Sequence, residues 1–190
     1  MSSPSKLATS VLSATNDYTL FQGILENLVD GVLIVTPQGR WLYGNRTAYR
    51  ICQELGLRSP IPEGVPDAIW QLCQRFLEQR INEDDRIPLI EAEICQEPLV
   101  RYRVRIRWLS LEESKSPYLL VTLEDCYDAA KNRAIAEIQQ YNLTSRQADV
   151  WILHRTGHSY RDIASKLFVT HNTVKRHMKD IHAKQRMHEL

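Results

Sequence analysis

Apolar residues near the start of the chain recur first at helical and then at extended spacing. Residues 17–29 carry apolar side chains on one helical face, which predicts an amphipathic helix capped by Asp17. After Gly31 the pattern changes to a short apolar run over residues 31–35. A second strand is expected over residues 41–44, beyond a Pro-Gln-Gly turn. The pattern therefore predicts a helix followed by a β-hairpin.

Helical spacing returns between residues 45 and 80 and then gives way to three further strands. Two or more helices are expected there, and the clearest covers residues 66–79, whose apolar residues share one face. Residues 87–95 and 101–109 alternate between apolar and charged side chains, as a strand with one buried face does. Residues 118–124 are expected to form the last strand.

One face of the strand predicted over residues 101–109 carries a row of four arginines. They are Arg101, Arg103, Arg105 and Arg107. One interpretation is a surface for nucleic acid. The favoured interpretation is a solvated sheet face whose arginines pair with Glu91 and Glu93 on the adjacent strand, because opposite charges on neighbouring strands attract.

Two helices are predicted in succession after the last strand. Residues 127–141 carry an apolar stripe, and we expect them to form a helix that connects two parts of the chain. Thr144 followed three residues later by Gln147 is a capping box, so the next helix should begin at Ser145. Gly157 is expected to end that helix.

Two more helices are predicted near the end of the chain. Residues 160–167 should form the first, and Thr170 should cap the second, which we expect from residue 171 to about residue 184. Three apolar residues of the last helix share the face that would meet a core: Val174, Met178 and Ile181.

The opposite face of this last helix combines cationic side chains with an amide. Its residues are Asn172, Lys175, Arg176 and Lys179. In the major groove of DNA, Lys and Arg suit guanine and Asn suits adenine. Thr170 and Thr173 lie at the start of the helix, where backbone N–H groups favour a phosphate. The arrangement matches a helix-turn-helix, although an ordinary solvated helix face would also carry such residues.

Charge is distributed unevenly along the chain. Residues 1–140 carry 15 Lys and Arg against 19 Asp and Glu, whereas residues 141–190 carry 9 against 4 and all six histidines. An excess of positive charge confined to one segment points to binding of nucleic acid.

The overall composition narrows the class of protein further. Hydrophobic residues make up 43% and charged residues 25%, which is typical of a globular protein. No run approaches the roughly 18 apolar residues of a membrane helix, and the Ser/Thr-rich start shows no secretory signal. We therefore expect a cytoplasmic protein without a membrane partner.

Cysteines and histidines give no clear metal or catalytic site. The cysteines contain no CxxC pair, so neither a zinc ribbon nor a thioredoxin-type site is predicted. In a reducing cytosol they are expected to be small buried hydrophobes rather than disulfide bridges, and a redox-sensing role is the alternative. They are Cys52, Cys73, Cys95 and Cys126. His154 and His158 are four residues apart, but Gly157 should end the helix between them. No metal site is predicted, and without a catalytic grouping we expect no enzyme.

Several spaced residues near the end of the chain resemble the LuxR-type (NarL/GerE-like) DNA-binding domain. They are Leu143-Thr144-x-Arg146, Gly157, Asp162-Ile163-Ala164-x-x-Leu167 and Thr173-Val174-Lys175-x-His177. The resemblance covers residues 142–184. It implies that Lys175, Arg176 and Lys179 contact bases or adjacent phosphates of double-stranded DNA, and that the domain binds DNA as a dimer.

Two departures from the LuxR-type pattern affect these expectations. Trp151 stands where the family usually has an aliphatic residue, which we interpret as repacking. The chain ends at Leu190, and Gln185 replaces the usual leucine, so the dimerising last helix is expected to be shortened. Homodimer contacts are therefore expected mainly through the first domain and the connecting helix.

The first domain resembles a PAS domain over residues 20–125. The resemblance rests on residues 28–35 and on Gly39-Arg40-x-Leu42-Tyr43-x-Asn45. It implies a five-stranded antiparallel sheet with flanking helices, used for sensing a ligand, for dimerisation or for both. The domain has no histidine, which excludes a His-ligated haem, and residues 45–48 do not match the cysteine motif of flavin-binding light sensors. No cofactor is predicted, and a small apolar ligand and a packed core without ligand both remain open.

The patterns together predict an α+β chain of four parts. These are a tail (1–16), a PAS-like domain (17–126), a connecting helix (127–141) and a helix-turn-helix domain (142–190). The expected function is sequence-specific DNA-binding regulation of transcription, with RNA polymerase as a further candidate partner. The alternative is a protein-interaction module whose helical domain binds a partner protein instead of DNA.

Overall fold

The computed structural model describes residues 19–56, 64–78, 89–111 and 117–188. The expected tail and the cap at Asp17 lie outside these residues. The chain divides into two compact units, one with residues 1–94 and 102–124 and the other with residues 95–101 and 125–190. Within the described residues, no helix has the length and apolar character needed to cross a membrane.

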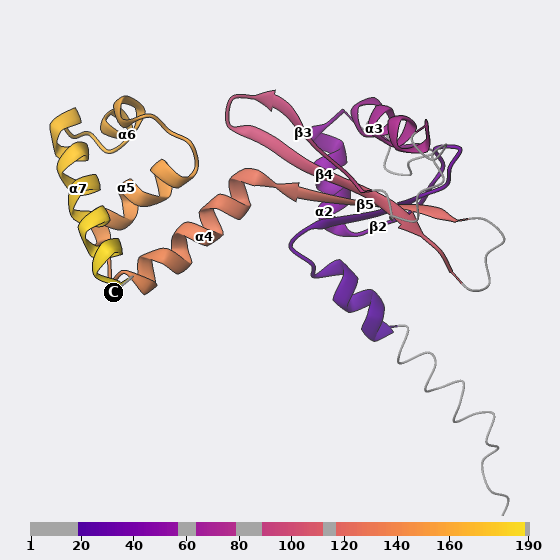
Figure 1. Cartoon of the computed structure of the whole chain (residues 1–190), viewed down its shortest axis with the longest axis horizontal. Coiled ribbons are helices and arrows are strands. Elements are labelled where there is room, and N and C mark those ends of the chain that lie inside the picture. The colour runs from indigo at the N-terminus through magenta and orange to yellow at the C-terminus, as the bar shows by residue number, and fades with distance from the viewer. Residues whose placement is uncertain (1–18, 57–63, 79–88, 112–116, 189–190) are drawn as a thin grey trace, which may run out of the picture. The chain divides into compact units, whose positions relative to one another are not determined.

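The first unit is built on a five-stranded sheet with the order β2-β1-β5-β4-β3 (Figure 1). The strands are β1 (Gly31–Val35), β2 (Trp41–Gly44), β3 (Ile90–Glu97), β4 (Val100–Leu109) and β5 (Tyr118–Asp125). The two neighbours of β1 in the sheet, the edge strand β2 and the central strand β5, both pair with it in antiparallel fashion. Two residues join β3 to β4, a length that only an antiparallel hairpin allows. The α+β fold with a five-stranded antiparallel sheet is confirmed.

Helices precede and follow the first hairpin of the sheet. A helix over residues 19–26 comes before β1, and α2 (Arg46–Glu54) and α3 (Asp67–Glu78) come after β2 (Figure 1). The first helix ends before the predicted residue 29. Its last turn tightens, because the backbone N–H groups of Asn27 and Leu28 bond to carbonyls only three residues back.

Alternation was predicted for residues 87–95 and 101–109, and it contributes to the core only through β4, where Tyr102, Val104 and Ile106 are buried. In β3 the side chains alternate between half-buried and exposed, so the predicted buried face of that strand is wrong. β1 and β5 also bury alternate side chains. The helices add apolar residues from α2 and α3 to the same core. The largest fully buried side chains include Tyr102, Phe76, Leu33, Ile51 and Ile69.

The arginine row on β4 lies on the other face of the sheet and is partly neutralised there. Arg103 bonds to Glu93 at 3.2 Å and to Glu124 at 3.1 Å. Arg105 bonds to Glu91 at 2.7 Å and to Glu124 at 3.3 Å, and the bond from Arg105 lowers the pKa of Glu91. The predicted pairing of the arginines with Glu91 and Glu93 is confirmed, and Glu124 on β5 is an additional partner.

The second unit consists mainly of four helices (Figure 1). They are α4 (Cys126–Gln140), α5 (Ser145–Arg155), α6 (Tyr160–Lys166) and α7 (His171–His188). The predicted capping box at Thr144 and Gln147 is confirmed, and Gly157 adopts a φ of 93° just beyond the end of α5. A second capping box, Ser159 with Asp162, begins α6 and was not predicted.

The last helix is longer than the sequence pattern predicted. It was expected to end at about residue 184, but it continues to His188. Residues 183–187 contain no glycine or proline, and alanine, lysine, glutamine, arginine and methionine are all good helix formers. The expected end was therefore wrong because nothing in the sequence stops the helix there.

The connecting helix α4 shares a core with the three helices that follow it. Ala134 is fully buried in that core, and Ile138 and Tyr141 pack against it. The indole N–H of Trp151 on α5 donates to the Glu137 carboxylate at 2.8 Å. The C-terminal part of α4 therefore belongs to the packing of the second unit, so no packing gap separates residues 127–141 from the helices that follow.

Candidate nucleic-acid interface

Packing of α7 determines which of its side chains face outward. Val174, Met178 and Ile181 are buried in the core of the second unit, as their helical spacing predicted. Four residues on the remaining surface of the helix are exposed: Asn172, Lys175, Arg176 and Lys179. The structure therefore places all four side chains of the predicted DNA-contacting face in solvent, on one side of a helix whose other side is anchored.

The start of α7 is held by the two threonines that the sequence analysis selected. The Thr170 hydroxyl accepts a hydrogen bond from the backbone N–H of Thr173 at 3.1 Å, and the two hydroxyl oxygens are 2.8 Å apart. Thr170 is exposed and Thr173 is half-buried. Because Thr170 already caps the helix, a phosphate at this end would be bound mainly by backbone N–H groups of the first turn.

Cations of the second unit fall into paired and unpaired groups. Lys184 donates to the carbonyl of Asn142 at 2.6 Å and to Gln147 at 3.0 Å, so it fastens the end of α7 to the start of α5. Arg155 pairs with Glu137 at 2.9 Å. By contrast, no carboxylate of the described residues pairs with the cations on the outer face of α7: Lys175, Arg176 and Lys179. Their charge is available to an external anion.

His158 has a structural role at the turn between α5 and α6. The residue is buried, and its ring Nδ1 lies 3.1 Å from the carbonyl of Leu153 and 3.2 Å from the Thr156 hydroxyl. Gly157 separates it from the end of α5, as predicted. Among the described residues, no group of three or more His, Cys, Asp or Glu side chains could hold a metal ion.

His154 lies in a row of rings on the helical unit. Its ring centroid is 5.7 Å from those of both Trp151 and Tyr160. Burial, followed by the nearby charges of His182 and Arg155, lowers the pKa of His154. This histidine therefore adds little positive charge to the unit at neutral pH.

Two of the four cysteines are chemically protected by the core of the first unit. Cys52 and Cys73 are buried, and burial raises the pKa of each thiol to about 12. A thiol that stays protonated is a poor nucleophile, so these two residues fit the predicted role of small hydrophobes. The expectation of burial is wrong for Cys95, which is exposed near the end of β3, and Cys126 is only half-buried.

Asn45 is a structural centre of the first unit that the sequence analysis treated only as part of a motif. Its side-chain oxygen accepts from the backbone N–H groups of Val32 and Ala48, both at 2.9 Å. Its side-chain nitrogen donates to the carbonyls of Leu25 and Asp30, both at 3.0 Å. The available signal was its place before α2, because asparagine is a preferred N-cap.

Trp41 is a second buried polar side chain in the first unit. The residue is 9% exposed, and its indole N–H has no hydrogen-bond partner among the described residues. Its ring lies 4.9 Å from that of Tyr49 on α2. A buried N–H without an acceptor is uncommon, because leaving it unpaired costs about 1–3 kcal/mol.

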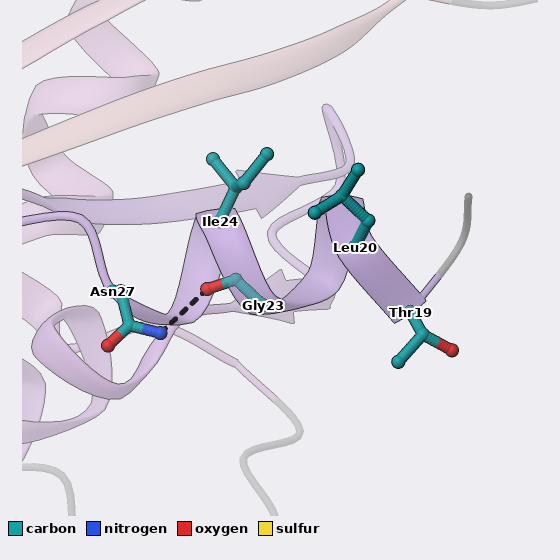
Figure 2. Close-up of a pocket in the computed structure, with 5 residues that line it drawn as sticks. All are labelled: Thr19, Leu20, Gly23, Ile24 and Asn27. Atoms are coloured by element: carbon teal, nitrogen blue, oxygen red, sulfur yellow. Dashed lines mark hydrogen bonds between the residues drawn. The ribbon is translucent and has the colours of Figure 1, made fainter. Parts of the chain in front are cut away.

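The helix over residues 19–26 presents apolar side chains to solvent. Leu20, Phe21 and Ile24 are each more than half exposed. Leu20 and Ile24 border an open hollow with Gly23 and Asn27, and Asn27 donates to the Gly23 carbonyl at 2.8 Å (Figure 2). The predicted apolar face of this helix is thus present but is not covered by the described residues of the chain.

Comparison with known proteins identifies the helical segment. Residues 141–190 match the family of bacterial regulatory proteins described as the luxR family. No curated protein is similar enough in sequence to the whole chain to be matched.

Solved structures resemble the chain at low overall similarity. A phage VqmA–DPO complex is 19% identical, with a TM-score of 0.43, over 90% of this chain and 83% of that chain. The PAS domain of nitrogen regulation protein NR(II) from Vibrio parahaemolyticus is 16% identical, with a TM-score of 0.36, over 56% of this chain and 97% of that chain. A PAS domain of an HTR-like protein from Haloarcula marismortui is 17% identical, with a TM-score of 0.39, over 58% and 98%. At these TM-scores the similarity supports no conclusion beyond the strand order described above.

Proposed function

We propose, from the LuxR-type helix-turn-helix domain at residues 141–190, that the protein is a sequence-specific DNA-binding regulator of transcription. The observation that carries the proposal is the outer face of α7, where the exposed cations have no carboxylate partner among the described residues. Such a regulator would act in the cytoplasm, with RNA polymerase as a candidate partner on the promoter.

The proposed roles follow from the chemistry and position of each side chain. Lys175, Arg176 and Lys179 would bind guanine edges or adjacent phosphates, and Asn172 would bind an adenine edge. Thr170 and Thr173 would hold the start of α7 in place while its first N–H groups approach a phosphate. Phosphate neutralisation would supply much of the affinity, so binding should weaken steeply as salt rises.

The direct test replaces Lys175 or Lys179 by alanine in the full-length protein. Each change is expected to weaken binding to a selected operator duplex by about 1–3 kcal/mol and, where a phosphate contact is lost, to lower the salt slope by about one. The fold should persist, because both side chains are exposed. Fluorescence anisotropy titrations at several salt concentrations measure both quantities.

Arg75→Ala is the matched control, because it removes the same charge from an exposed position on α3. It should leave operator affinity nearly unchanged. Full affinity in both α7 variants would contradict the assignment of this helix to DNA. A complex with a partner protein that forms without DNA and is insensitive to salt would favour the alternative function.

We also propose that the protein is a homodimer, mainly through the first unit and α4. The exposed apolar side chains on the helix over residues 19–26 support this, since contiguous apolar surface is usually an interaction site. Ile135 on α4 is a further exposed apolar residue. A second copy of the chain would bury both surfaces, and paired domains match a two-fold symmetric operator.

The dimer is tested by replacing Leu20 and Ile24 together by glutamate. Because each side chain would lose about 1.5–3 kcal/mol of burial in the interface, the dimer dissociation constant should rise by at least about a hundredfold. Sedimentation equilibrium of the full-length protein measures the change. Leu42→Glu, at an exposed residue on β2, is the control and should leave the dimer intact. A double variant as dimeric as the wild type would refute this interface.

Ligand sensing is the other task we propose for the first unit. The supporting observation is the buried Trp41 indole N–H, since an acceptor atom of a small bound molecule would supply its missing hydrogen bond. The test is mass spectrometry of the purified native protein, where a mass above that of the chain alone is the expected result.

A further inference from the structure

Phe168 lies in the turn between α6 and α7 and is almost completely exposed. Its exposed fraction is 94%, the highest among the exposed large hydrophobic residues of the described chain. An isolated apolar residue on a surface is ordinary. Phe168 differs because its backbone is also in an unfavourable conformation, with a φ of 55°.

The backbone of the turn explains the positive φ but does not require a phenylalanine. The N–H of Phe168 bonds to the carbonyl of Ser165 at 3.3 Å, and the N–H of Val169 bonds to that of Ala164 at 3.0 Å. These bonds end α6 through a left-handed residue, a position that glycine and asparagine fill with least strain. A left-handed conformation costs most other residues roughly 1–2 kcal/mol.

The phenyl ring of Phe168 therefore gains no stabilisation from packing in the folded chain. At 94% exposure it has almost no packing within the chain, and its backbone conformation is strained. A phenylalanine here stabilises the fold on neither count, and a contact with a molecule outside the chain would account for it.

The surroundings of Phe168 favour a polyanion as that molecule. Arg161 and Lys166 on α6 are exposed, and Asp162 is the one acidic residue between positions 160 and 176. The Asp162 carboxylate is held by the Ser159 hydroxyl at 2.6 Å within the capping box. The segment that contains Phe168 is therefore rich in exposed cations, has one acidic residue, and leads directly into the start of α7.

We infer that Phe168 is a DNA-contacting residue whose ring packs against the apolar parts of the duplex beside the N-terminal end of α7. Asn172 follows four residues later, so the two Cα atoms are at most about 14 Å apart. The apolar parts of DNA within reach are thymine methyl groups and deoxyribose, and phenylalanine is a known contact for the thymine methyl. The inference deepens the proposed function and rests on it.

The test uses Phe168→Asn and Phe168→Gly in the full-length protein. Both residues accept a positive φ, so the thermal unfolding temperature should stay equal or rise. Binding to a duplex selected by the wild-type protein from random sequence should nevertheless weaken about tenfold, equivalent to about 1.4 kcal/mol. Fluorescence anisotropy and thermal unfolding measure the two effects.

Met187→Asn is the matched control, because Met187 is 77% exposed near the other end of α7. It should leave DNA affinity unchanged. Replacing thymine by deoxyuridine in the duplex distinguishes a contact to thymine methyl groups from a contact to deoxyribose. If the wild-type protein then loses as much DNA affinity as the Phe168 variants do, the contact is to methyl groups. If it loses none, the contact is to deoxyribose.

These experiments give different results if the inference about Phe168 fails and if the proposed DNA-binding function fails. Equal affinity of wild type and both Phe168 variants, with weaker binding by Lys175→Ala, overturns the inference alone and assigns the ring to a partner protein. Failure of the wild type to select any duplex overturns the proposed function itself. Reduced stability together with reduced binding in both variants would also refute the inference, since it would show that the ring supports the fold.

Discussion

Asn45→Ala is expected to lower the free energy of unfolding of the first unit by about 3 kcal/mol or more. The side chain is fully buried, and it bonds to four backbone groups that come from different segments. Alanine would leave two N–H groups and two carbonyls without these partners, at about 1–3 kcal/mol for each group that water cannot reach. Since natural domains are stable by only about 5–15 kcal/mol, the loss would be severe.

Amide hydrogen exchange followed by peptide mass spectrometry measures this effect within each unit separately. Exchange should accelerate in β1 and α2 and stay unchanged in α5–α7. Asn27→Ala is the control, because Asn27 is exposed and makes its side-chain bond to Gly23 on the surface. Equal protection in the Asn45 and Asn27 variants would show that the buried network does not hold the unit together.

Trp151→Ala is expected to destabilise the second unit by about 3–5 kcal/mol, the usual cost of removing a buried tryptophan. The indole fills the shared core of α4 and α5, and it donates to Glu137 at 2.8 Å. Arg155 also lies over its ring, 5.6 Å from the centroid. The change would therefore remove packing volume and the hydrogen bond that attaches α4 to the helix-turn-helix domain.

Glu137→Ala separates these two contributions. It keeps the indole in the core and removes the carboxylate that accepts from its N–H, so it should cost about 1.5–3 kcal/mol, the range for one hydrogen bond to a charged group. Hydrogen exchange of α4 and limited proteolysis between residues 125 and 142 report whether the helix has detached. If α4 stays fully protected in Trp151→Ala, Trp151 is not what holds it.

The attachment of α4 also changes how the two units should be separated for study. A cut after residue 141 would expose Ala134, Ile138 and Tyr141, which pack in the core of the second unit. Asp125 is the N-cap of α4 and the last residue of β5. The boundary that preserves the packing of the second unit therefore lies near Asp125, before the helix.

Local sequence rules accounted for most of the secondary structure. The capping box at Thr144 and Gln147 placed the start of α5 at the correct residue, because the bonds involved are between residues three positions apart. Alternation over residues 101–109 identified the buried face of β4. The end of α7 was wrong, since a helix without a stop signal ends where its packing and solvation decide.

Contacts between residues far apart in sequence were not predictable in the same way. Asn45 bonds to Leu25, 20 positions away, and Trp151 bonds to Glu137, 14 positions away. Trp151 was interpreted from the sequence as repacking, and the structure adds that its indole N–H donates to a carboxylate on another helix. Spacing rules contain no information about such partners, because they describe one element at a time.

The candidate DNA-binding face shows what the sequence determines by itself and what only the tertiary structure determines. Helical spacing alone determined that Lys175, Arg176 and Lys179 share a side of α7, because side chains three and four positions apart lie on one face. The tertiary structure decided which cations remain available. It pairs Arg103, Arg105 and Lys184 with acceptors on other segments and leaves the outer face of α7 without a carboxylate partner among the described residues. A cation is available to DNA only when no acceptor from another segment pairs with it. Which acceptors come close to each cation is determined by the packing of segments that are distant in the sequence.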